Sequence, residues 1–250
     1  MPIFKTDGKV LYYAHVPKCG GSSVNRYLND RFGAAAFVVS KFNQQAAAHR
    51  WSKTSPQHVD AATLARLFPA GFFDASFTIV RHPVARLVSA YHFHKEVERT
   101  IPEPCSFSEW LEDLEARHAA DPFYLDNHTR PMADIVPNEA VVFHLELGLA
   151  PLIGWLDALL GKSGGPRDIA EVNKRGAHGA PTTPRVTPTE ADLALIARRY
   201  DADFRRFGYR IDQKLPVGGA VPLRPAAAPI RPAWRLGHEL TGVLRRLRGH

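Results

Sequence analysis

Apolar residues over the first 210 positions occur either in short continuous runs or at helical spacing. The runs that predict buried strands are Val10–Val16, Phe77–Val80 and Val141–Leu145. A turn and a helical pattern follow each of the first two runs. The apolar faces of these two helices are Val24, Tyr27, Leu28 and Phe32, then Val84, Leu87, Val88 and Tyr91. Strands that alternate with helices predict an α/β fold with a mainly parallel sheet flanked by helices.

Two further helices are predicted from their starting residues. Ser106 and Glu109 have the spacing of a capping box, with Trp110, Leu111 and Leu114 directed inward. Thr187 and Glu190 have the same spacing, with Pro188 at the first helical position. The apolar face expected in this last helix is Leu193, Ile196, Tyr200 and Phe204.

The composition changes near the C-terminal end, and we predict three regions. Residues 1–211 form one domain, 212–233 a Pro/Ala-rich linker and 234–250 a basic amphipathic tail. The apolar stripe of the tail is Leu236, Leu240, Val243, Leu244 and Leu247. This pattern is typical of a helix that binds an anionic membrane surface or a partner. It is equally typical of a helix that folds back on the domain.

The formal net charge of +7 is concentrated in the same region. Residues 214–250 hold seven Lys or Arg and one Glu, so the rest of the chain is close to neutral. This argues against a nucleic-acid-binding face. The two cysteines make neither a disulfide framework nor a zinc motif. With no signal-peptide core or membrane-length apolar run, we expect a cytoplasmic protein, with peripheral membrane contact through the tail as one option.

The segment between the first strand and its helix has the composition of an anion site. Residues 15–23 read HVPKCGGSS. The N–H groups and positive dipole at a helix start favour an anion, and the two glycines allow a close approach of the backbone. Ser22 or Ser23 is placed to cap the helix, both add hydroxyl donors, and Lys18 adds a mobile positive charge.

Two common phosphate loops do not fit this segment. A Walker A loop carries its lysine after the last glycine, whereas Lys18 precedes the glycine pair. A phosphatase loop of the Cys-x5-Arg kind needs Arg at position 25, which is Asn25 here. We therefore expect Cys19 to be a small loop residue rather than a nucleophile.

Segment 15–24 resembles the 5′-phosphosulfate loop of sulfotransferases that use 3′-phosphoadenosine 5′-phosphosulfate (PAPS). Residues 81–91, which read RHPVARLVSAY, resemble the 3′-phosphate motif of the same family. The resemblance covers most of residues 11–209 and is closest to the bacterial and carbohydrate-modifying branch. It implies a P-loop-NTPase-like sulfotransferase fold, PAPS as co-substrate, no metal, and transfer of the sulfuryl group to a hydroxyl, which in that branch belongs to a carbohydrate.

The resemblance assigns nucleotide-binding roles to residues of both motifs. These are Pro17, Lys18, Cys19, Gly20, Gly21, Ser22, Ser23, Arg81 and Ser89. Helical geometry places Arg86 and Ser89 on the face opposite the apolar stripe. Many relatives carry Asp where this chain has His82, which puts only the capping of that helix in question. Lys174 and Arg175 lie in a segment that resembles the family more weakly. We expect them either to contact the nucleotide or an anionic acceptor, or to be solvated.

Sulfuryl transfer needs positive charge at the leaving oxygen and a base at the acceptor hydroxyl. The resemblance gives the first role to Lys18. For the base we favour His58, because a histidine has a pKa near neutrality. His58 also lies at the position, ahead of the second strand, where similar enzymes carry a Gly-His pair or an equivalent. His15, His94 and His128 compete for this role.

Two alternatives remain at the level of sequence. A nucleotide or sugar kinase with a variant phosphate loop would need a carboxylate for magnesium, and Glu146 after the third strand is the comparable residue. A non-catalytic module that binds anions or glycans would keep the fold without turnover.

Overall fold

A computed structural model describes residues 1–39, 41–50, 52–172 and 183–217. The predicted tail, most of the predicted linker, Lys174 and Arg175 lie outside these residues. Within the described part, no helix is long and apolar enough to cross a membrane.

The predicted sheet is confirmed, with one strand that the sequence did not reveal. The strands are β1 (Ile3–Thr6), β2 (Lys9–Ala14), β3 (Ala75–Val80) and β4 (Val141–His144), in the order β1-β2-β3-β4. The β2–β3 and β3–β4 pairs are parallel, whereas β1 pairs antiparallel with β2. Asp7 and Gly8 form the turn between β1 and β2 with φ angles of 46° and 73°, which suits a tight two-residue hairpin. The sheet is therefore mainly parallel.

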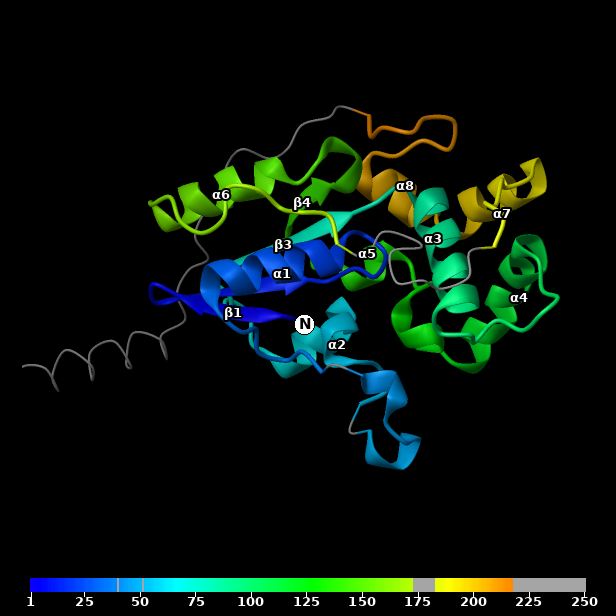
Figure 1. Cartoon of the computed structure of the whole chain (residues 1–250), viewed down its shortest axis with the longest axis horizontal. Helices are drawn as coiled ribbons and strands as arrows, with labels where there is room; N and C mark the ends of the chain where they lie inside the picture. The colour runs from blue at the N-terminus through cyan, green and yellow to red at the C-terminus, as the bar shows by residue number, and fades with distance from the viewer. Residues whose placement is uncertain (40, 51, 173–182, 218–250) are drawn as a thin grey trace, which may run out of the picture.

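Helices cover both faces of the sheet and one end of it (Figure 1). In chain order they are α1 (Gly21–Phe32), α2 (Ala61–Leu67), α3 (Pro83–Glu96), α4 (Phe107–Ala120), α5 (Met132–Ile135), α6 (Ala150–Leu160), α7 (Glu190–Arg199) and α8 (Asp201–Phe207). Leu11 and Tyr13 of β2 belong to the core formed with α1 and α6, while Tyr12 and Ala14 belong to the core beside α2. This alternation is what a central strand covered on both faces requires.

A third apolar cluster lies beyond the carboxyl ends of β2 and β3. It begins at Val16 and Val80 and joins residues of α3, α4, α5, α7 and α8. Figure 1 shows α3, α4 and α7 grouped on that side of the sheet. The loops that follow β2 and β3 therefore lie between the sheet and a helical cluster, where ligands commonly bind in parallel α/β proteins.

The helix starts are partly as predicted. Ser106 and Glu109 form the expected capping box of α4. The second box is displaced, because Thr189 and Asp192 cap α7 and Pro188 lies before the helix. The apolar face predicted for this single helix is divided between two helices, because α7 ends before Tyr200 and α8 follows.

The cap predicted for α1 is wrong. Gly20, with a φ of 80°, occupies that position without a side-chain hydrogen bond. The two serines fall inside the first turn, and Ser23 Oγ instead accepts a hydrogen bond of 2.9 Å from the backbone N–H of Val172.

Candidate active site

The predicted phosphate loop joins the carboxyl end of β2 to the start of α1. Lys18 and Gly20 both have left-handed backbone conformations, with φ angles of 68° and 80°. Between them Cys19 is fully buried, and burial raises its pKa to about 12. A protonated, enclosed thiol is unsuited to nucleophilic attack, in agreement with the expectation from sequence.

Gly21 opens α1 directly beneath the His15 ring. A β-carbon at position 21 would lie 1.7 Å from His15 Nε2 and 2.4 Å from its Cδ2. The imidazole is further held against Tyr13, at 5.4 Å between ring centroids. Only glycine therefore allows this histidine and the start of the helix to pack together.

We expect Gly21→Ala to lower the free energy of unfolding by about 1–3 kcal/mol, because the loop must shift to relieve the overlap. The matched control is Gly154→Ala in α6, where a β-carbon meets no atom within 4 Å. This control should be neutral or slightly stabilising. Urea unfolding of both variants measures the difference. Equal stability of the two would show that His15 does not constrain position 21.

The Lys18 ammonium lies against an aromatic ring of α3. Its Nζ lies 3.7 Å from the centroid of the Phe93 ring on α3. Burial, assisted by the positive charge of Arg81, lowers the pKa of Lys18 to about 8. Lys18 is thus a desolvated cation in the predicted phosphate loop, and perturbed side chains of this kind are often found at functional sites.

Arg81 follows β3 and reaches back to the first loop. Its Nη1 donates a hydrogen bond of 3.3 Å to the carbonyl oxygen of Lys18, so the two predicted phosphate motifs are in contact. Ser89 lies two turns into α3 and is partly buried. His82 caps α3 by accepting a hydrogen bond from the Val84 N–H, so the replacement of the usual Asp retains the cap.

Arg86, which helical geometry places with Ser89 on the face opposite the apolar stripe, is buried. Its guanidinium donates hydrogen bonds to the carbonyl oxygens of Pro17 at 3.1 Å, His128 at 3.1 Å and Arg130 at 2.8 Å. The loop over residues 127–130 covers this face of α3. Arg86 therefore fixes the phosphate loop relative to that loop.

His58 is oriented by a carboxylate distant in sequence. Its Nδ1 lies 2.8 Å from Asp126 Oδ2, and Asp126 also accepts hydrogen bonds from the backbone N–H and hydroxyl of Ser55, at 2.6 and 2.7 Å. Burial alone would raise the pKa of Asp126, but His58 and Ser55 together lower it. With the ionised carboxylate accepting the Nδ1 proton, Nε2 of His58 is the nitrogen that can accept another.

An unusual backbone presents Asp126. Leu125, Asp126 and Asn127 have consecutive left-handed φ angles of 53°, 55° and 62°. Strain of this kind persists only where surrounding contacts hold it and occurs preferentially at functional sites. One such contact is the hydrogen bond of 2.8 Å from the Asn127 side chain to the carbonyl oxygen of His58.

The three competing histidines surround His58. His15 and His128 lie 4.9 and 5.1 Å from it between ring centroids, and His94 Nε2 is 2.7 Å from His128 Nδ1. Burial lowers the pKa of His15 and His128 well below the usual value, and burial and Lys18 lower that of His94 to about 3. These shifts make all three weaker bases than an ordinary histidine.

A family model described as the sulfotransferase family matches residues 1–147, more than half of the chain. The chain belongs to the sulfotransferase family. No curated protein and no solved structure gave a match. Family membership supports a transferase that moves sulfuryl groups.

The part that matches the sulfotransferase model contains both phosphate motifs, His58 and Asp126. The sequence analysis did not assign a role to Asp126 or Ser55. The only local signal was the run of polar residues Asp126-Asn127-His128-Thr129-Arg130. His58 and Asp126 are 68 positions apart, and a contact between such distant residues leaves no local pattern in the sequence.

Glu146 has a different role from the one the kinase alternative requires. Its Oε1 accepts a hydrogen bond of 2.7 Å from the backbone N–H of His82, and its Oε2 accepts one of 2.9 Å from the hydroxyl of Tyr209. Both oxygens thus anchor neighbouring structure in this sulfotransferase. This contact pattern favours a structural carboxylate over a magnesium ligand.

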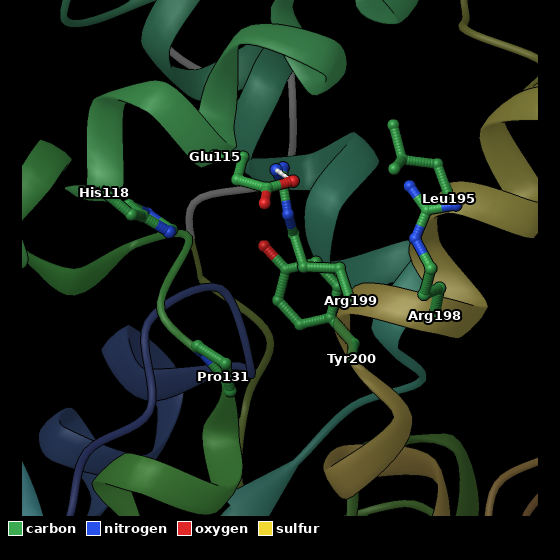
Figure 2. A pocket seen from close by; sticks show the side chains of 7 residues that line it. All are labelled: Glu115, His118, Pro131, Leu195, Arg198, Arg199 and Tyr200. Atoms are coloured by element: carbon green, nitrogen blue, oxygen red, sulfur yellow. Dashed lines mark hydrogen bonds and ion pairs between the residues drawn. The ribbon is translucent and has the colours of Figure 1, made fainter.

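Two cavities of the sulfotransferase lie away from both phosphate motifs. One of about 320 Å³ is lined by His118, Arg198, Arg199 and Tyr200, and Figure 2 shows Arg199 in it paired with Glu115, at 3.1 Å. The other, of about 520 Å³, borders the amino ends of β3 and β4. Neither includes a predicted site residue.

Proposed function

We propose that this chain transfers the sulfuryl group of PAPS to a hydroxyl, and that the acceptor is a carbohydrate. The observation that carries the proposal is the His58–Asp126 pair at 2.8 Å beside a phosphate loop that contains a desolvated lysine. Phe93 links the two parts, because Lys18 lies over its ring and His128, next to His58, packs against the same ring at 5.3 Å. The carbohydrate assignment and a P-loop-like fold rest on the resemblance of the motifs.

In the proposed reaction, His58 Nε2 removes the proton of the acceptor hydroxyl while Asp126 holds Nδ1 and stabilises the imidazolium. The hydroxyl oxygen forms a bond to sulfur as the bond from sulfur to the bridging phosphate oxygen breaks. Lys18 stabilises the negative charge that develops on that oxygen. Arg81 and Ser89 bind the 3′-phosphate, and the N–H groups at the start of α1 bind the 5′-phosphate.

The nucleotide assignment is tested by calorimetric titration with 3′-phosphoadenosine 5′-phosphate and with AMP, which lacks only the 3′-phosphate. We expect the wild type to bind the first at least about tenfold more tightly, and Arg81→Ala to remove this preference, because a charged hydrogen bond contributes about 1.5–3 kcal/mol. Arg66→Ala, an exposed arginine on α2, is the control.

Equal affinity of the wild type for both nucleotides would contradict the 3′-phosphate site. Preferential binding of ADP with magnesium would favour the kinase alternative. Thermal melting of Arg81→Ala distinguishes a lost contact from a misfolded chain.

A further inference from the structure

The residues around His58 form a group of metal-ligand donors as well as a base. His58, Asp126 and His128 each offer a ligand atom, and these atoms lie within 4.8 Å of one another. In a tetrahedral zinc site, bonds of about 2.0–2.2 Å place ligand atoms roughly 3.3 Å apart. Side-chain movements of about 1.5 Å would therefore bring all three atoms to one cation.

The donors are held by further contacts of the kind that support metal ligands. Ser55 fixes the Asp126 carboxylate through its hydroxyl and its N–H. His94 fixes the His128 ring through the bond of 2.7 Å between Nε2 and Nδ1. These contacts hold the Asp126 and His128 side chains close to one another in the absence of an ion, which reduces the entropy lost on binding.

A second observation concerns His15 at the edge of this group. Its Nδ1 is buried and has no hydrogen-bond partner among the described residues, although the ring lies 4.9 Å from His58. A buried imidazole nitrogen without a protein partner retains the capacity to hydrogen-bond a small polar group. A cation or its bound water in the His58 group would give this nitrogen a neighbour.

We propose that His58, Asp126 and His128 bind a divalent transition-metal cation of the Zn²⁺ class. Two imidazoles and one carboxylate favour Zn²⁺, Co²⁺ or Ni²⁺ over Mg²⁺ or Ca²⁺, which prefer oxygen ligands. The Asp126 charge attracts the cation, while the Lys18 ammonium nearby opposes it. Since the bound cation occupies His58, it inhibits sulfuryl transfer; this last clause alone rests on the proposed function.

The test uses the full chain without an affinity tag, treated with a chelator and then titrated with Zn²⁺ in a calorimeter. We expect one site in the wild type and at least a tenfold loss of affinity in both Asp126→Asn and His128→Asn. His49→Ala, an exposed histidine outside the group, should bind like the wild type. Wild-type affinity in the two site variants, or no binding by the wild type, would overturn the proposal.

A measurement on the wild type alone covers the case in which a variant fails to fold. Co²⁺ bound by nitrogen ligands in a four- or five-coordinate site gives visible absorption bands that Zn²⁺ removes. If these absorption bands do not appear, the proposed metal site is contradicted. Because no nucleotide is present, this result is independent of the Arg81→Ala titration, so either proposal can fail without the other.

Discussion

His58→Ala is expected to lower kcat by about 10²–10⁴-fold, the usual contribution of a positioned general base. The protein places His58 at a buried site and fixes its Nδ1 with Asp126, 2.8 Å away. Alanine removes the proton acceptor but none of the nucleotide-binding residues. Affinity for 3′-phosphoadenosine 5′-phosphate should therefore change little.

Asp126→Asn separates the base from its orientation. Asparagine keeps the size of the side chain but removes the charge that stabilises the imidazolium and selects its tautomer. We expect kcat to fall by about 10²-fold or more, with a smaller change in KM. Release of 3′-phosphoadenosine 5′-phosphate from PAPS measures both variants, with the most active glycan from an acceptor screen.

His49→Ala again serves as the control for a histidine substitution. If His58→Ala retains kcat within about threefold of the wild type, the proton is removed by another group. If instead both variants lose nucleotide affinity, His58 and Asp126 support the loop rather than the chemistry.

Much of the fold follows from local pattern. Strands β2, β3 and β4 were predicted because each contains a short apolar run, and α1 and α3 because their apolar residues keep helical spacing. The exceptions depend on context. The strand β1 is only four residues long, and it is stable because β2 pairs with it. The break at Tyr200 leaves the apolar spacing almost unchanged, so periodicity did not reveal it.

Part of the candidate site follows from local motifs. Lys18 and Arg81 each lie in a short motif that follows a strand, and their contact agrees with the way parallel strands bring such loops to one edge of the sheet. The Asp126 partner of His58 was not found, because the contact spans 68 positions and depends on three left-handed residues. The burial of Arg86 was not predicted for a similar reason, since the loop that covers it comes from residues 127–130.

Lys18→Ala is expected to lower kcat by about 10²–10³-fold, the effect of removing one preorganised charge from the leaving oxygen. The pKa of Lys18 near 8 adds a pH signature. The ammonium is present below this pH and is lost above it, so kcat/KM of the wild type should fall about tenfold per pH unit above pH 8. The phosphates of bound PAPS favour the charged form, so the decrease in kcat itself should begin at higher pH.

The variant should lose this alkaline decrease along with its activity, whereas Lys53→Ala, an exposed lysine, should keep both. Rates measured from pH 6 to pH 10 at limiting and saturating PAPS give the two profiles. A decrease near pH 8 that persists in Lys18→Ala would assign it to a different group. In that case the desolvation of Lys18 over Phe93 would serve to pack the loop rather than to stabilise the leaving phosphate.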